Sequence, residues 1–263
     1  MLKYLTIAKT GLFETLFFPK RLITIMLVMP FRMLVVSIIY KYAFSVYGGS
    51  INNIDANTAI WSISLYFLLL YVQFRAIFSD VNMEVKSGDI EVRINKPYNI
   101  FLYKFFYNLG KNTPVFLVAL VAVTPLLYFL TGGFPRAISG LDLLGFALLF
   151  TIGSILSGLM YFLMSLGSFW TEDAQPFFWL FDKGVMILGG SYVPVAIMPE
   201  TFRNLAIYLP FGAPILANRL FNPEFSTDWL FLLAVQLLWL VFFAIFTSLV
   251  LKKALTKVSV NGG

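Results

Sequence analysis

The sequence contains no cysteine and no histidine. Without cysteine the chain has no disulfide, no thiolate nucleophile and no sulfur for a lipid anchor. Without histidine it lacks the commonest general base and metal ligand near neutral pH. We therefore predict no catalytic residue and no metal site in this chain.

Charged residues are also scarce, at 12% of the chain, whereas 59% of the residues are hydrophobic and the mean hydropathy is +0.84. This composition is typical of an integral membrane protein. The net charge is +6, but the basic residues flank apolar runs, as expected for contact with anionic lipid head groups. Membrane lipids are thus predicted partners and nucleic acid is not.

Six segments are predicted to span the membrane, because a helix needs about 20 mostly apolar residues to cross about 30 Å of hydrocarbon. The predicted spans are residues 22–46, 58–78, 114–130, 141–169, 176–195 and 229–251. The fifth contains the adjacent pair Asp182 and Lys183, which is tolerated where it faces protein or water. The expected fold is an all-α integral membrane protein with a single transmembrane domain over residues 1–263.

The positions of the basic residues predict the orientation, since cytoplasmic loops are rich in lysine and arginine. With the N-terminus inside, the outer loops hold only Arg136, Arg203 and Arg219. The inner side then holds 13 of the 19 basic residues: Lys3, Lys9, Lys20, Arg21, Arg75, Lys86, Arg93, Lys96, Lys104, Lys111, Lys252, Lys253 and Lys257. Six spans with both termini cytoplasmic fit this asymmetry.

Two further segments are predicted to lie at the membrane surface. Residues 2–18 have leucines and phenylalanines mostly on one side, which favours an N-terminal interfacial helix on the inner leaflet; a frayed terminus is the alternative. Between the fifth and sixth spans, Pro194, Pro199, Pro210 and Pro214 interrupt an external segment. Within it, residues 200–209 fit a short amphipathic helix or a partial re-entry into the membrane.

A charged island, residues 78–104, lies between the second and third predicted spans. Its acidic and basic residues are mixed, which suits docking to a protein better than adhesion to acidic lipid. Ser87 and Gly88 permit a turn, Ile90 and Ile94 stand four apart as docking residues, and Pro97 ends the element. An ordinary solvated loop is the alternative.

The chain contains no nucleotide-binding motif of the form GxxxxGK[ST]. Gly110-Lys111 lacks both the upstream glycine and the following hydroxyl residue. We therefore expect no cofactor on this chain, and if ATP drives its function, another subunit must bind it.

Two stretches carry a resemblance to a known family. They are SGDIEVRINKPYNIFLYKF, residues 87–105, and WTEDAQPFFWLFDKGVMILGGSYVPVAIMPETFRNLAIYLPFGAPI, residues 170–215. Together with the six predicted spans, they resemble the permease subunits of ABC-2 type exporters, in particular the short bacterial permeases without a fused ATPase. The resemblance extends over essentially the whole chain.

The resemblance implies a multi-pass permease of the bacterial inner membrane that exports a hydrophobic or amphipathic substrate. It implies two permeases, identical or paired with a sister subunit, bound to two ABC ATPase subunits that hold ATP and Mg. The loop after the second span would hold the coupling helix, with a second contact after the fourth span. With the docking residues above, the expected ATPase contacts are Glu84, Lys86, Gly88, Asp89, Ile90, Glu91, Arg93, Ile94, Pro97, Glu172 and Asp173.

Three charges are predicted within the spans. Arg32 lies about 15 Å along the first span, too deep to reach the interface easily, so it should face protein or a watery cavity. We expect Asp182 and Lys183 to be its neighbours, and the three charges to hold the bundle together near its inner third.

Two other classes of protein remain open. A secondary transporter coupled to protons or other ions needs an intramembrane acid, and Asp182 is the one acid deep in a predicted span. A membrane-embedded lipid-modifying enzyme needs polar residues clustered at one membrane face, where Glu172 and Asp173 are the candidates.

Overall fold

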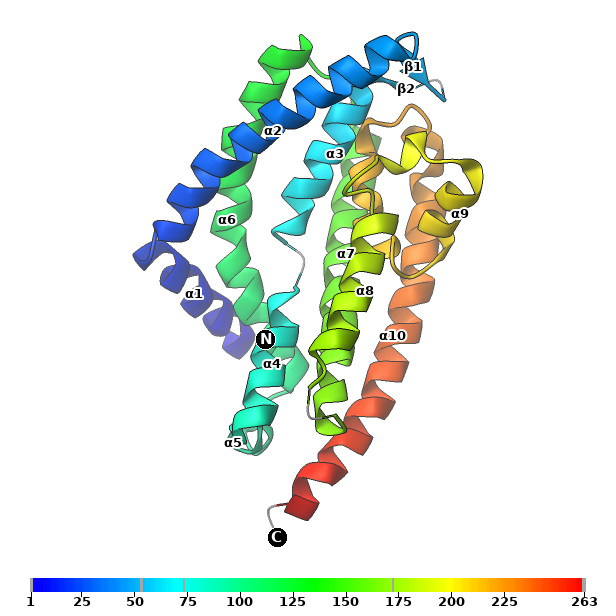
Figure 1. Cartoon of the computed structure of the whole chain (residues 1–263). Coiled ribbons are helices and arrows are strands. Elements are labelled where there is room, and N and C mark those ends of the chain that lie inside the picture. Colours follow the sequence, from blue (N-terminus) through cyan, green and yellow to red (C-terminus); the bar gives the residue numbers. More distant parts are fainter. Residues whose placement is uncertain (1, 53, 73, 172, 262–263) are drawn as a thin grey trace.

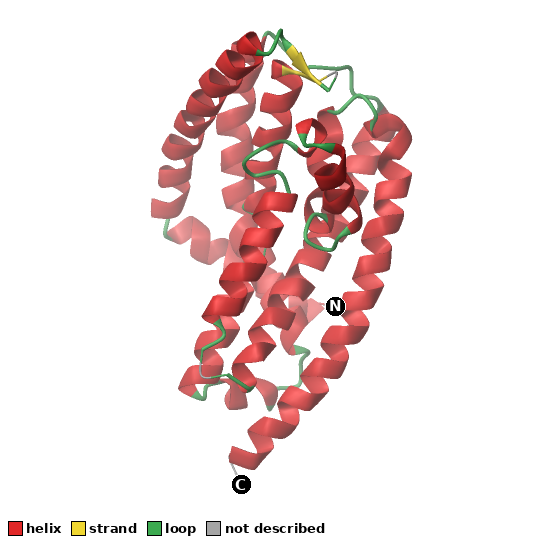
Figure 2. Ribbon diagram, turned by 45° about the vertical axis from the view of Figure 1, so that its right-hand side comes forward, coloured by secondary structure: helices red, strands yellow, loops and turns green. Residues whose placement is uncertain are grey.

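The computed structural model describes residues 2–52, 54–72, 74–171 and 173–261. The chain forms an elongated bundle of helices with one small β-hairpin (Figures 1 and 2). Helices α4 and α5 lie at one end of the bundle, together with the end of α10, and the hairpin lies at the other. We refer to these as the α4–α5 end and the hairpin end.

Among the described residues, four helices are long and apolar enough to cross a membrane. They are α2 (Lys20–Val46), α6 (Ile100–Thr131), α7 (Gly140–Leu166), which continues into the 3₁₀ helix η1 (Gly167–Phe169), and α10 (Phe225–Asn261). Apolar side chains such as Ile38 and Leu238 are exposed on α2 and α10, as expected for helices that face lipid. The prediction of an all-α, multi-pass membrane protein is thus confirmed at this level.

The second and fifth predicted spans differ from expectation. The uninterrupted helix predicted over residues 58–78 is wrong, because α3 (Ala56–Leu70) ends before a break and α4 (Ala76–Ser87) follows it. The fifth predicted span, residues 176–195, corresponds to α8 (Gln175–Leu188), which ends before residue 195. With 15 and 14 residues, α3 and α8 extend only about 22 Å and 21 Å. Six complete spans therefore remain a prediction. The helix that contains the third predicted span, α6, begins at Ile100 rather than at residue 114.

Helix α3 forms the centre of the bundle, since every residue from Thr58 to Leu69 is buried. A helix that is buried on all sides must be surrounded by other elements. Here α2, α6 and the 3₁₀ helix η3 (Ala213–Phe221) pack against it. Asp55 caps its first turn by accepting a hydrogen bond of 3.0 Å from the Thr58 amide.

Short elements form the hairpin end. Strands β1 (Ser50–Ile51) and β2 (Ile54–Asp55) pair antiparallel, with Ile51 opposite Ile54. The proline-interrupted segment forms η2 (Val195–Ile197), α9 (Glu200–Tyr208) and η3. The short helix predicted over residues 200–209 is confirmed as α9, and its side of the membrane remains a prediction.

Helix α1 (Leu2–Phe17) packs along α6 instead of fraying. The two helices cross where Gly11 and Gly110 lie, so close that a Cβ on Gly110 would overlap the Ala8 carbonyl. Leu2, Leu5 and Phe17 stay exposed on the other side of α1. This arrangement fits the predicted interfacial helix, with an apolar face available to lipid.

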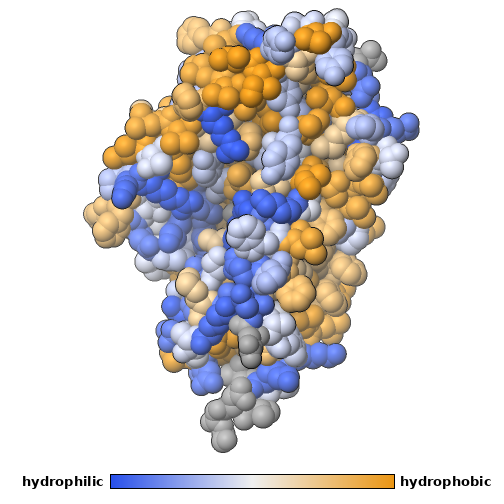
Figure 3. All heavy atoms as spheres, viewed as in Figure 1, coloured by the Kyte–Doolittle hydropathy of each residue, from blue (hydrophilic) through white to orange (hydrophobic). Residues whose placement is uncertain are grey.

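The surface is divided in polarity along the bundle. In Figure 3, hydrophobic side chains cover most of the upper part of the visible face, towards the hairpin end, and hydrophilic ones gather in its lower half, towards the α4–α5 end. The polar part of the surface is where the charged island folds.

Candidate functional site

The charged island and its neighbours form an open groove of about 660 Å³ at the α4–α5 end. Four elements supply its walls: α1, α4, α5 (Ile90–Ile94) and the first half of α6. The lining residues are Thr10, Asp80, Met83, Glu84, Ser87, Asp89, Arg93, Tyr103, Lys104, Tyr107 and Lys111. The groove thus combines residues that are up to about 100 positions apart in the sequence.

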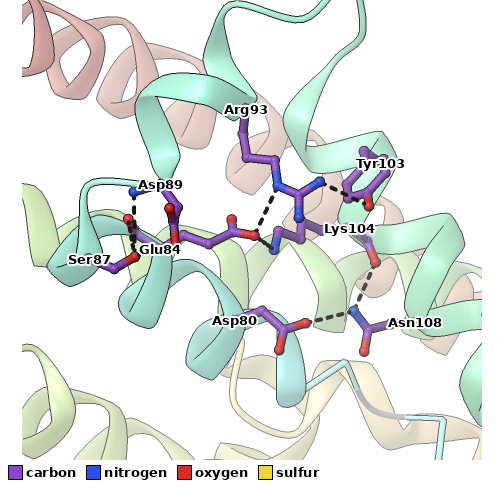
Figure 4. Close-up of polar contacts among 8 residues, drawn as sticks. All are labelled: Asp80, Glu84, Ser87, Asp89, Arg93, Tyr103, Lys104 and Asn108. Atoms are coloured by element: carbon purple, nitrogen blue, oxygen red, sulfur yellow. Dashed lines mark hydrogen bonds and ion pairs between the residues drawn. The ribbon is translucent and has the colours of Figure 1, made fainter.

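Glu84 joins three of these elements (Figure 4). Its Oε1 accepts a hydrogen bond of 2.7 Å from Lys104 of α6 and lies 3.2 Å from the Arg93 Nε of α5. The Glu84 side chain is only 15% exposed and that of Lys104 only 5%. Predicted as a contact for the ATPase, Glu84 instead mainly holds α4, α5 and α6 together.

Two further contacts stiffen the same corner (Figure 4). Arg93 donates a hydrogen bond of 3.3 Å to the Tyr103 hydroxyl. The Asn108 amide nitrogen donates to the Lys104 carbonyl at 3.0 Å and lies 3.5 Å from an Asp80 carboxylate oxygen. Arg93 is therefore also engaged within the chain rather than free to dock.

The outward surface of the island is formed by the turn between α4 and α5. Gly88 adopts a left-handed conformation with φ +81°, which permits the tight reversal between the two helices. Ser87 donates a hydrogen bond of 2.7 Å to Asp89 within this turn. The exposed residues from the end of α4 to Pro97 are Lys86, Ser87, Gly88, Asp89, Glu91, Val92, Asn95, Lys96 and Pro97. They present charges of both signs to a partner.

The predicted docking residues Ile90 and Ile94 point towards the bundle. Ile90 is 3% exposed, and Ile94 is partly buried against the same apolar side chains of the bundle. Val92, between them, is 62% exposed. Ile90 anchors α5 to the bundle, so its side chain is not on the surface of this chain, and its predicted contact with an ATPase stays a prediction. Helix α5 also ends at Ile94, and the Pro97 carbonyl accepts a hydrogen bond of 3.0 Å from Lys3.

The second predicted contact region lies beside the first. Lys86 of α4 forms an ion pair of 2.9 Å with Asp173, just before α8. The hydrogen bond from Lys86, followed by that from the Gln175 amide, lowers the pKa of Asp173. Both side chains are about half exposed, so this pair contributes little stability. Glu172 lies outside the described residues.

The charges inside the bundle are paired differently from our expectation. Asp182 of α8, 4% exposed, accepts hydrogen bonds from Arg75, at the start of α4, and from the Tyr161 hydroxyl of α7. Arg32 of α2 lies 3.6 Å above the ring of Phe67, and Lys183 is exposed. The predicted pairing of Arg32 with Asp182 is wrong, since Arg75 is the basic partner.

Arg75 is thus the residue that sequence reasoning missed. It falls near the end of the second predicted span, residues 58–78, and among the basic residues that the predicted orientation places on the inner side. One chemical signal was available in the sequence. A buried aspartate such as Asp182 needs a basic partner, and Arg75 lies within the second predicted span, near its end.

An apolar cluster connects the charged island to the transmembrane helices. The cluster comprises Phe74, Ile77, Val81, Ile90, Ile100, Phe105, Phe162 and Leu166, from the start of α4 through α5 and α6 to α7. Phe74 stacks on Phe105 with ring centroids 4.4 Å apart. The cluster thus gives α4 and α5 direct packing contacts with α6 and α7, and packed interiors of this kind transmit strain.

Among the described residues, no group of three or more acidic side chains has the geometry to hold a metal ion. Comparisons with protein-family models, curated proteins and solved structures found no match to this chain.

Proposed function

We propose that the chain is the membrane-spanning permease subunit of an ATP-binding cassette exporter, with a hydrophobic or amphipathic substrate. The observation that best supports this is the α4–α5 element. Its outer surface carries charges of both signs, and its inner surface is anchored by Ile90 and Glu84 to the membrane helices. A subunit that receives work from a separate motor needs both properties.

In this proposal the α4–α5 end is cytoplasmic and the membrane is the bacterial inner membrane. Two ABC ATPase subunits, which hold ATP and Mg, dock at the turn around Gly88, and Asp173 and Lys86 lie beside it. A second permease, identical or homologous, completes the complex. No residue of this chain acts in bond-making chemistry.

Movement at the docking surface has two routes into the bundle. Through the apolar cluster it reaches α6 and α7, and through Arg75 and Asp182 it reaches α8. The break between α3 and α4 separates the buried centre of the bundle from the docking element. Nucleotide-driven closure of the ATPases would thus reorient α4 against α3 and change the side to which the substrate path opens.

The test is purification of the tagged protein in a mild detergent, followed by mass spectrometry of proteins retained at near-equal stoichiometry. We expect a P-loop ATPase in the wild-type sample. It should be lost from the double variant Asp89→Lys/Glu91→Lys, which changes two exposed side chains and leaves the buried Ile90 between them unchanged.

A matched control is Lys252→Glu/Lys253→Glu, which also reverses two exposed charges towards the same end of the bundle. It should retain the ATPase. If the wild-type protein is stable yet carries no ATPase in several mild detergents, the proposal fails.

The alternative of an ion-coupled secondary transporter rests on Asp182, which is buried within the bundle. Its contacts with Arg75 and with the Tyr161 hydroxyl favour a structural role, because both carboxylate oxygens already have partners within the chain. Transport by the purified chain without any ATPase, abolished by Asp182→Asn, would favour this alternative.

A further inference from the structure

Arg219, in η3 at the hairpin end, is buried without a polar partner for its guanidinium among the described residues. Its side chain is 5% exposed, and its Nη1 is shielded from solvent and has no acceptor. Within the described part of the chain, the guanidinium makes no hydrogen bond and no ion pair. A buried arginine in such surroundings is costly, because desolvation is not offset by a paired anion.

Arg219 lines a small cavity together with a second arginine. The cavity has a volume of about 110 Å³, and its walls are Asn52, Ile54, Ala196, Arg203, Arg219, Asn222, Pro223 and Glu224. Arg203 comes from α9 and Asn52 from the β-hairpin, so three separate elements converge here. A single water needs only about 10–15 Å³ of such space, so the cavity is large enough for a small oxyanion.

The charges around this cavity leave Arg219 without full compensation. Burial lowers the pKa of Arg219, and Arg203 adds to that effect, while Asp228 and Glu224 oppose it. Glu224 is the single carboxylate in the cavity wall, against two guanidinium groups. Waters would supply acceptors but no negative charge.

Arg136 offers a contrast at the same end of the bundle. It forms an ion pair of 3.1 Å with Asp142 and donates hydrogen bonds of 2.8 Å to Ser226 and 3.0 Å to the Leu220 carbonyl. A structural arginine here is thus paired by the chain itself, whereas Arg219 has no such partner in the part of the chain that the structure describes.

We propose that the cavity between Arg203 and Arg219 is a binding site for a phosphate-class oxyanion, either free or carried on the head group of an amphiphile. An oxyanion there accepts charge-assisted hydrogen bonds from both guanidinium groups, which arginine forms in a planar, two-pronged geometry. This inference does not depend on the proposed function, and in the proposed orientation the site faces the outer side of the membrane.

The test uses the full-length chain in a phosphate-free, uncharged detergent. Binding and thermal unfolding are measured with inorganic phosphate, dioctanoyl phosphatidic acid and dioctanoyl phosphatidylcholine. We expect phosphate or phosphatidic acid to bind and to raise the unfolding temperature. Arg203→Gln should weaken binding by about tenfold or more, as expected for the loss of one charge-assisted contact.

Arg219→Met separates a binding role from a structural one. Without ligand, this variant should unfold at the same temperature as wild type or higher, because it removes an unpaired buried charge. It should also lose the ligand-induced rise. Lys41→Gln, which removes a cation near the same end of the bundle, should bind as wild type does.

The arms of the experiment distinguish the sources of the anion. Binding of inorganic phosphate at least as tight as that of phosphatidic acid assigns a free anion, and tighter binding of phosphatidic acid assigns a head group. The proposal is overturned if neither binds, if phosphatidylcholine binds as tightly as phosphatidic acid, or if Arg203→Gln binds as well as wild type.

Discussion

Lys104 of α6 donates a hydrogen bond of 2.7 Å to Glu84 of α4, and both side chains are largely withdrawn from water. This pair fixes α4 to the first part of α6. It also separates two kinds of charge in the island: those that hold its fold and those that face outward.

We predict that Glu84→Gln destabilises the protein by about 3 kcal/mol, because Lys104 is left buried without its counter-ion. The double variant Glu84→Gln/Lys104→Met should recover most of that loss, since it removes both charges. Unfolding by sodium dodecyl sulfate, followed by circular dichroism, measures the differences. Equal stability of Glu84→Gln and wild type would show that the pair contributes nothing.

Asp182 and Arg75 provide a second prediction. Asp182→Asn keeps an acceptor for Tyr161 but removes the counter-ion of Arg75, and we expect a loss of about 1–3 kcal/mol. Tyr161→Phe should cost about 1 kcal/mol, because one hydrogen bond to a charged group is lost while the ring remains packed. The same unfolding assay compares them, with Lys183→Gln as the exposed neighbouring control. A larger loss for Lys183→Gln than for Asp182→Asn would contradict this assignment.

The attachment of helix α1 to α6 should weaken at low pH. The hydrogen bond from Tyr107 and the contact with Lys111 lower the pKa of Glu14 below its ordinary value of 4.5. Since the folded pKa is the lower one, this contribution is present above pH 4.5 and is lost as the pH falls through the folded pKa.

The absence of native cysteines allows this prediction to be measured with two introduced cysteines that carry spin labels. Phe13→Cys on α1 and Val121→Cys on α6 are exposed positions. The distance distribution between them should broaden below pH 4.5. In the background of Tyr107→Phe, which removes the main cause of the low pKa, the broadening should begin at higher pH. An onset that does not move would exclude Glu14 as the titrating group.

The crossing of α1 and α6 provides a steric prediction. Gly110→Ala places a methyl group on the Ala8 carbonyl, and overpacking of this kind costs about 1–3 kcal/mol. Gly140→Ala is the matched control, because a Cβ there meets no atom within 4 Å. Unfolding midpoints of the two variants should differ, and the spin-label distance should change only for Gly110→Ala. Equal midpoints would show that α1 does not pack as described.

Composition and hydropathy determined the membrane class of this protein and its four long helices. Runs of apolar residues beyond 20 have no other stable environment than lipid, so their positions could be predicted from local sequence alone. The turn at Gly88 and the helix after Pro199 were also predictable, because glycine and proline restrict or permit backbone conformations locally.

Only the tertiary structure decided where α3 ends and which charges pair. The break after Leu70 falls in YVQFR, which contains no proline or glycine, while Phe74 stacks on Phe105 and Arg75 reaches Asp182. Arg75 and Asp182 are 107 positions apart, so no local pattern predicts their contact. Likewise, a five-residue helix is too short to show a periodicity, and packing alone turned Ile90 inward and Val92 outward.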